Sequence, residues 1–540
     1  MGKKKSSFIK QAGILAAAGI VSRIIGILYR SPLTSVIGDE GNGYYQSAYS
    51  IYTIVLLLCS YSIPAALSKI IAEKLAKKEY QNVQRIFHCA LMYVCAVGGI
   101  ASLFLYFGAG LFLDGKASIV LRAFTPTIFV SGFVGVLRGY FQAHGSMLQT
   151  SISQIIEQIL NAIVSILAAY LLIHAVSNTD DTTKAIYGAV GSTIGTGSGV
   201  LVAFFFMLFV YMVNRKFIHK RMRNDSTGKV DSYKVILGML LSMVTPIIIS
   251  TFIYNFNVSF NLVVYTKTMV NFKGFTSAEA ATQYGIFSGK ALVILNIPIA
   301  IAAAMSSAMI PAIASTKARG NSKATNSRIE NAMFVTLLIA IPCAVGIGVL
   351  ARPVMQLLFP QRESLEQASI LLMLTAVTVI FDSLSALSNG ILQGIGKVKI
   401  PVRNAAIALT LQSCTLAVLL AFTDLNLYAL VICLLLYSFT MFLLNNISVH
   451  KYTRLRENVT KIYILPLAAA LVMGLVAWLV YHGLYLAVHS NAVCLAAAIL
   501  MAVLVYFVAV IKLRIITEEE LQTIPYGSKI ITVSKKMHLM

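Results

Sequence analysis

Long apolar runs separated by short polar segments follow one another along the whole chain. A run of about 20 apolar residues is long enough to cross the hydrocarbon core of a bilayer as a helix. The pattern predicts fourteen spans, with approximate bounds 11–36, 44–68, 86–113, 119–141, 147–174, 185–213, 235–264, 286–314, 331–358, 367–392, 402–423, 426–449, 462–486 and 491–512. The predicted fold is therefore an all-α polytopic membrane protein with about 14 transmembrane helices.

Three short sequence strings recur in the same order at a nearly constant offset. The pairs are Ile63–Ser68 with Ile310–Ser315, Cys95–Gly98 with Cys343–Gly346, and Gly139–Gly145 with Gly390–Gly396. An even number of spans separates the two copies, so both insert with the same orientation and are related by an axis along the membrane normal. The repeat predicts two six-helix lobes, at 1–228 and 229–450, followed by two extra helices in 451–512 and a cytoplasmic tail at 513–540.

Composition agrees with a membrane protein, and the placement of charge orients it. Hydrophobic residues make up 58% of the chain and charged residues only 12%, well below the roughly 25% of soluble domains. The net charge of +23 does not indicate a nucleic-acid partner, because the basic residues gather in alternate loops. If Lys3-Lys4-Lys5 lies inside, six basic residues fall in outer loops: Lys116, Lys184, Lys267, Lys273, Arg352 and Arg362. The positive-inside rule then predicts that both termini are cytoplasmic.

Four basic residues, Arg23, Arg30, Arg122 and Lys290, are predicted within or near the hydrocarbon. An arginine keeps its charge at any relevant pH, and at mid-bilayer it costs about 2.5–3.5 kcal/mol. Arg23 lies near the middle of the first span, and Arg30 follows seven residues later, so the two share a helix face. Such a charged stripe predicts a wet cavity that receives an anionic ligand.

Each charged residue has a functional and a structural interpretation. Arg23 could bind a diphosphate through its planar guanidinium, or form an ion pair with Glu157 or Asp382. Arg30 could complete the phosphate site or extend to the outer interface. Lys290 could contact the phosphate from the second lobe or lie among outer headgroups. For Arg122 we favour an interfacial anchor.

The remaining candidates concern the inner mouth and coupling. Lys69 and Arg138 are predicted at cytoplasmic helix ends, where they would complement the helix dipole or guide a lipid headgroup. Glu157 and Asp382 are the two acids well inside spans, where acids serve proton or cation relays or pair with arginine. We favour pairing for Glu157 and leave both interpretations of Asp382 open.

Several function classes lack their signatures. The longest predicted loops are short, no Walker A motif is present, and neither cysteine nor histidine has metal-ligand spacing, so no catalytic residue, metal or cofactor is predicted. The string Gly195-Thr-Gly197-Ser-Gly199 lies inside a span, where glycines let helices approach closely. The sequence therefore predicts a protein that is not an enzyme.

The chain resembles the multidrug/oligosaccharidyl-lipid/polysaccharide (MOP) exporter superfamily, and within it the SpoVB/MurJ-like lipid-linked oligosaccharide flippases. The resemblance covers nearly the whole chain. Its most specific motifs are Arg138-Gly-Tyr-Phe-Gln142 and Ser153-Gln-Ile-Ile-Glu157-Gln158, and Ser22-Arg23-Ile-Ile-Gly26 supports them. The tail, Ile516-Thr-Glu-Glu-Glu-Leu521 with Ile524-Pro525-Tyr-Gly527, adds to it. Arg23 matches an arginine that lines the cavity in that family, Arg30 is shifted by one residue, and Lys290 matches loosely a basic residue of the eighth span.

The resemblance implies a flippase of the bacterial cytoplasmic membrane. It would translocate an undecaprenyl-diphosphate-linked oligosaccharide, either lipid II or another envelope polysaccharide precursor, by alternating access. The implied partners are this polyprenyl-diphosphate-linked saccharide and membrane lipids, with a coupling cation or the membrane potential as an open question. The alternatives are a cation-coupled multidrug exporter of the same superfamily and, less favoured, a membrane glycosyltransferase or polymerase.

Overall fold

The computed structural model describes residues 18–19, 21–57, 62–113, 115–223, 225, 230–318, 320–359, 361–455 and 458–516. Every regular element in these ranges is helical. The basic terminus Lys3-Lys4-Lys5 and the tail motifs between Glu518 and Gly527 lie outside them. The chain divides into two compact units, Met1–Gly289 and Lys290–Met540. This division falls later than residue 228, and the lobe boundaries expected from the repeat stay a prediction.

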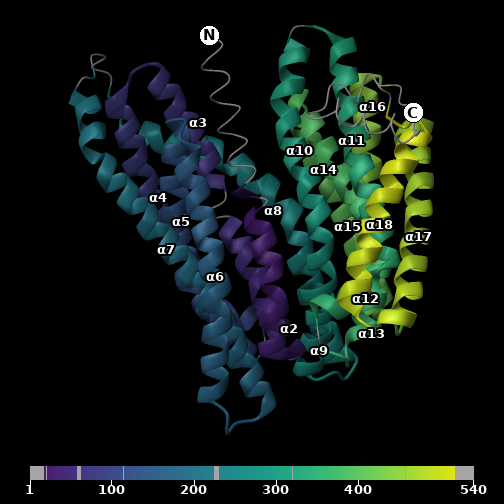
Figure 1. Cartoon of the computed structure of the whole chain (residues 1–540). Helices are drawn as coiled ribbons and strands as arrows, with labels where there is room; N and C mark the ends of the chain where they lie inside the picture. Colours follow the sequence, from purple (N-terminus) through teal and green to yellow (C-terminus); the bar gives the residue numbers. More distant parts are fainter. Residues whose placement is uncertain are drawn as a thin grey trace. The chain divides into compact units, whose positions relative to one another are not determined.

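The first unit begins with a helical stretch at 21–28, which passes through Tyr29 into α2 (Figure 1). Its further helices are α2 (Arg30–Leu56), α3 (Ser62–Ala76), α4 (Tyr80–Phe112), α5 (Ala117–Ala143), α6 (Met147–Ala175), α7 (Asp181–Arg223), α8 (Tyr233–Phe272) and α9 (Ser277–Ile286). A π-helical turn, Phe287–Ala291, follows α9. Apolar side chains of α3, α4, α5, α7 and α8 form the main core, which includes Leu67, Ile86, Val136, Met207 and Ile236.

The second unit contains α10 (Leu292–Ala318), α11 (Ser322–Val349), α12 (Ala351–Leu358), α13 (Leu365–Thr375), α14 (Thr378–Gly394), α15 (Lys399–Phe422), α16 (Leu427–Thr453), the π-helical turn Thr460–Ile464, α17 (Leu465–Val488) and α18 (Asn491–Lys512). Its core joins α11, α14, α16 and α17 through residues such as Leu337, Leu387, Val449 and Ala469. The last two helices, α17 and α18, lie side by side (Figure 1).

Many of these helices are long and apolar enough to cross a membrane. Among the described residues ten meet the length and hydropathy requirements, and an eleventh is added if α13 and α14, which meet at a 45° bend, form one span. The chain is therefore a multi-pass membrane protein. The expected number of fourteen stays a prediction. The gap expected between the first two spans is instead a kink in α2 at Gly38, whose φ of +70° is readily adopted only by glycine.

One of the three recurring pairs of sequence strings, Gly139–Gly145 with Gly390–Gly396, has the same local structure in each unit. The C-cap of α5 is His144, and Gly145 follows with φ of +75°; the C-cap of α14 is Ile395, and Gly396 follows with φ of +81°. The two ends make matching backbone hydrogen bonds, Gly145 to Gln142 and Ser146 to Phe141 in one, Gly396 to Gln393 and Lys397 to Leu392 in the other. Both are Schellman caps, which satisfy the last carbonyls of a helix. At this point of the chain the sequence repeat is also a repeat of backbone conformation.

Candidate functional site

Arg23 is exposed on a helical stretch whose other exposed residues are apolar. Val21, Ile24 and Leu28 are each more than 40% exposed and form one strip. At 100° per residue, Arg23 lies roughly 130° around the helix from the middle of that strip. Its side chain makes no ion pair or hydrogen bond with any part of the chain that the structure describes. Glu157, considered as an ion-pair partner of Arg23, pairs with Arg138 instead. The pairing of Arg23 with Asp382 stays a prediction.

The Arg23 helix packs against α6. A methyl group placed on Gly26 would lie 3.6 Å from Oε1 of Gln158. Gly26 is nearly one turn after Arg23, so the arginine lies beside this contact and away from the apolar strip. The motif Ser22-Arg23-Ile-Ile-Gly26 therefore combines a charged residue with the glycine that brings its helix close to α6.

Arg30 lies two turns further along the same helix. The hydrogen bonds from Tyr29 N to Ile25 O and from Leu33 N to Tyr29 O continue the helix through Tyr29. The Arg30 guanidinium lies over two rings, 5.8 Å from the centroid of Tyr45 and 5.9 Å from that of Tyr49. Its Nη1 is buried and has no hydrogen-bond partner among the described residues. Cation–π contact stabilises the charge without occupying this donor.

A chain of hydrogen bonds runs from these rings to α6 and α7. Tyr45 Oη lies 3.2 Å from Oγ1 of Thr196, which donates to Oδ1 of Asn161 at 3.3 Å. The Asn161 amide donates to Oη of Tyr29 at 3.4 Å. Sequence reasoning did not select these residues, because a tyrosine in a span does not by itself indicate a polar network.

Arg138 and Glu157 form an ion pair inside the first unit. Nη2 of Arg138 donates to Oε2 of Glu157 at 2.7 Å, and Nε donates to Oγ of Ser153 at 2.8 Å. The two side chains are only 15% and 23% exposed. The two most specific sequence motifs, one on α5 and one on α6, thus meet through their charged residues. Arg138 lies on α5, one turn and a half before this helix ends at Ala143. Its guanidinium there is the partner of Glu157.

This ion pair borders a cavity of about 260 Å³ between α2, α3, α5, α6 and α7. The polar side chains that line it are Tyr52, Ser131, Arg138, Gln142, Gln154 and Glu157. Tyr52 stacks on Phe124 at 4.4 Å between ring centroids and lies 5.8 Å from Tyr49, so ring contacts connect the cavity to the Arg30 site. The cavity and the two arginines of the first helix therefore belong to one region of the first unit.

Lys290, expected as an opposing phosphate contact, is buried at 1% exposure. Its ammonium donates to Oγ of Ser364 at 2.7 Å and lies 5.7 Å from the ring centroid of Phe359. A lysine among outer headgroups would be exposed, so the interfacial interpretation does not describe this conformation. A phosphate contact would require the bond to Ser364 to be replaced.

The other two candidates stand apart from these groups. Asp382 is half-buried on α14, and none of the ion pairs in the described ranges includes it. Lys69 is exposed on α3, so it is available to a headgroup, and no described contact gives it a further role. Within the described ranges no group of three His, Cys, Asp or Glu residues is arranged to hold a metal ion.

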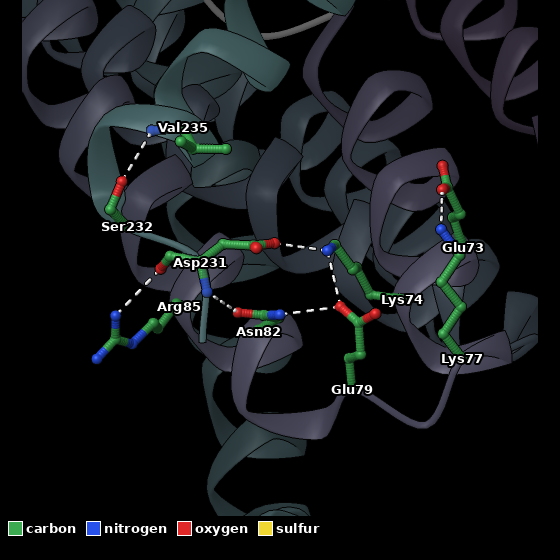
Figure 2. A network of polar contacts seen from close by, with 9 residues as sticks. All are labelled: Glu73, Lys74, Lys77, Glu79, Asn82, Arg85, Asp231, Ser232 and Val235. Atoms are coloured by element: carbon green, nitrogen blue, oxygen red, sulfur yellow. Dashed lines mark hydrogen bonds and ion pairs between the residues drawn. The ribbon is translucent and has the colours of Figure 1, made fainter. Parts of the chain in front are cut away.

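A network that sequence reasoning missed joins the α3–α4 loop to the start of α8 (Figure 2). The Lys74 ammonium donates to Glu79 at 2.7 Å and to Asp231 at 2.5 Å. Asn82 donates to Glu79 at 2.9 Å and accepts from the Asp231 backbone N–H at 2.7 Å. Arg85 donates to the Asp231 carbonyl at 3.1 Å. The contacts to Asp231 join residues about 150 positions apart, which is why no local pattern in the sequence predicts them.

Comparison with known families gives two matches. Residues 8–317 match the family described as polysaccharide biosynthesis protein, which is more than half of the chain. Residues 289–419 match the MatE family.

Individual relatives and solved structures agree. The chain is 28% identical to the lipid II flippase MurJ of Bacillus subtilis (strain 168) over 75% of this chain and 76% of that protein. It is 25% identical to stage V sporulation protein B of the same organism over 98% and 99%. A solved structure of lipid II flippase MurJ in an inward closed conformation aligns with a TM-score of 0.65 at 16% identity, over 92% and 97% of the two chains. That similarity supports the fold.

Proposed function

Because the chain belongs to the polysaccharide biosynthesis protein family of the MOP exporter superfamily, we propose that it flips a polyprenyl-diphosphate-linked saccharide across the bacterial cytoplasmic membrane. The cargo is lipid II, the substrate named for the flippase to which the chain is similar, or another envelope precursor. The protein would act as a transporter, with both termini in the cytoplasm.

The observation that carries the proposal is Arg23, a permanent charge without a protein partner in an apolar membrane helix. A guanidinium there is costly unless a ligand or water solvates it, and a diphosphate offers oxygens for bidentate hydrogen bonds. Arg30 lies on the same helix with a buried, unpartnered Nη1. The two arginines would bind the diphosphate while the polyprenyl tail stays in the bilayer.

The test is complementation in cells depleted of their own lipid II flippases, with lipid II in the outer leaflet as the measured quantity. Wild-type protein should restore it. Arg23→Ala should lower the rate roughly 10- to 100-fold, because a charge-assisted hydrogen bond contributes about 1.5–3 kcal/mol. Arg23→Lys should retain part of the activity, since a lysine keeps the charge but not the bidentate geometry.

Arg122→Ala is the matched control. Arg122 is an exposed arginine whose guanidinium lies 5.8 Å from the ring centroid of Tyr106, and it does not line the cavity beside Arg138, so its loss should leave flipping unchanged. Full activity of a folded Arg23→Ala protein would refute the role of Arg23. If well-expressed wild-type protein does not restore lipid II in the outer leaflet, lipid II is excluded as the cargo. The same assay is then repeated with other envelope precursors.

A second candidate, a cation-coupled multidrug exporter, is favoured by the match of residues 289–419 to the MatE family. Asp382 lies in that segment, half-buried and without an ion pair in the described ranges, as a coupling acid would. The two candidates differ in cargo. Ethidium exclusion by cells that express the chain and lack their own drug pumps would favour the exporter, whereas the flippase proposal expects no change.

A further inference from the structure

The cavity between α2, α3, α5, α6 and α7 combines groups of opposite charge with amides. Arg138 uses Nε and Nη2 for Ser153 and Glu157, which leaves the donors of Nη1 without a protein partner in the described ranges. Glu157 uses Oε2, which leaves Oε1 as an acceptor. Gln154 Oε1 is buried and accepts no hydrogen bond from the described residues. The cavity therefore presents both donors and acceptors whose capacity is not used by the protein.

The charges decide what class of ligand fits. Arg138 and Glu157 are paired at 2.7 Å, so together they bring no net charge to the cavity. A phosphate would approach the Glu157 carboxylate, and a cation would approach the Arg138 guanidinium; each contact is unfavourable in a partly buried site. A neutral polyhydroxyl ligand meets neither difficulty, because each hydroxyl both donates and accepts.

Size and shape restrict the ligand further. The cavity volume is about 260 Å³, below the range of about 300–1,000 Å³ typical of sites for drug-sized ligands, so it suits a single ring. Tyr52 provides an aromatic side chain at the wall, and Ser131 and Gln142 add further polar groups. A sugar ring has an apolar face and hydroxyls around its edge. An aromatic side chain can pack against that face while the surrounding polar groups hydrogen-bond the hydroxyls.

We propose that this cavity binds the sugar ring next to the diphosphate of the lipid-linked cargo. The inference rests on the proposed function and assigns the saccharide to a site distinct from the arginines that would bind the diphosphate. Arg23 lies on the helix that packs through Gly26 against Gln158, the neighbour of Glu157 in the sequence, and ring contacts link Arg30 to Tyr52. A diphosphate on the arginines would thus have its first sugar at the cavity.

The experiment measures binding to the purified full chain in lipid nanodiscs. The probes are undecaprenyl diphosphate, undecaprenyl-diphosphate-N-acetylglucosamine and lipid II. We expect wild-type protein to bind at least one glycosylated probe more tightly than the bare diphosphate. Gln154→Leu should weaken glycosylated binding by about tenfold and leave undecaprenyl diphosphate unchanged, since an unmade hydrogen bond to a buried group is worth on the order of one factor of ten.

Gln149→Leu is the matched control on the same helix. Gln149 lines a different cavity, of about 190 Å³, and accepts a hydrogen bond from Ser146. The control should bind every probe like wild type. If Gln154→Leu does not fold, as judged by size-exclusion chromatography, Gln142→Leu removes another polar group of the cavity.

The outcomes separate the two proposals. Equal affinity of wild-type protein for all three probes would overturn the sugar site and leave the diphosphate site intact. An equal loss for all probes in Gln154→Leu would also overturn it, because the side chain would then act on the diphosphate or on the fold. Failure of wild-type protein to bind any probe would contradict the proposed function itself. Arg23→Ala should weaken all three probes alike.

Discussion

The arginines of the first unit illustrate three ways of keeping a charge at low cost. Arg138 is neutralised by Glu157, Arg30 lies over two tyrosine rings, and Arg23 is exposed without a protein partner. An arginine in an ion pair has its electrostatic partner built in, whereas an unpaired one depends on solvent or ligand. At the scale of residues, the sequence identifies which positions are charged, and the partners found in the fold distinguish structural charges from available ones.

Lys74 offers a quantitative test of the network in Figure 2. Lys74→Met leaves Glu79 and Asp231 without their shared cation, so the apparent free energy of unfolding should fall by about 1–3 kcal/mol. Lys77→Met, which removes the exposed ion pair between Glu73 on α3 and the residue that follows this helix, should change stability little. Thermal unfolding in detergent measures both. Equal effects of the two variants would contradict a structural role for the network.

The pH dependence follows from the same contacts. The hydrogen bond from Lys74 lowers the pKa of Glu79 against the opposing effect of burial. For Lys74, burial lowers the pKa, but hydrogen bonds to Asp231 and Glu79 outweigh it and the pKa is raised. The Glu79 contribution is lost as pH falls through its lowered folded pKa, and the Lys74 contribution as pH rises through its raised one. The difference between Lys74→Met and wild type should therefore stay constant from about pH 6 to 9 and shrink in acid.

Helix α7 contacts α6 through a row of glycines four residues apart. A Cβ placed on Gly191 would lie 2.4 Å from the backbone of Ala169, one on Gly195 would lie 2.1 Å from Oγ of Ser165, and one on Gly199 would lie 2.4 Å from the carbonyl oxygen of Glu157. The close approach expected for Gly195 and Gly199 is thus confirmed. Small residues allow this contact and let packing hold membrane helices together. At the scale of elements, the row fixes the α6 backbone that carries Glu157.

Gly195→Ala tests this helix contact. The added methyl has no room without separation of the two backbones, so stability should fall by about 1–3 kcal/mol or more. Gly110→Ala is the control, because a Cβ there has no atom within 4 Å and alanine is the better helix former. Thermal unfolding should show a loss for the first variant and no loss for the second. An unchanged Gly195→Ala protein would mean that α6 and α7 are further apart than described.

At the scale of the whole molecule, two compact units carry the repeated strings and matching helix caps. Each unit contains its own core and its own polar groups: the Arg138–Glu157 pair in the first, and Asp382 with the Asn404–Asn445 hydrogen bond of 2.9 Å in the second. The two units thus carry different polar side chains. The proposed cargo contacts identified here belong to the first unit.

The orientation in the membrane is testable on the whole chain. The excess of basic residues predicts that the α3–α4 loop is cytoplasmic and the α6–α7 loop external. In an otherwise cysteine-free protein, Lys77→Cys should react with an impermeant maleimide only after the cells are opened, and Lys184→Cys should react in intact cells. Both positions are at loop-side helix ends of the described structure. The opposite labelling pattern would invert the predicted topology.

The sequence by itself determined that this is a helical, multi-pass membrane protein of the MOP superfamily, because hydrophobic length, the recurring strings and the Arg138 and Glu157 motifs can be read without a fold. It also singled out Arg23, since charge in an apolar run is visible without a fold. Only the tertiary structure decided which partner each charge has: Glu157 pairs with Arg138, Lys290 donates a hydrogen bond to Ser364, and Arg23 has no protein partner in the described ranges. Pairing joins residues from different helices, and the packing of those helices depends on the whole three-dimensional arrangement.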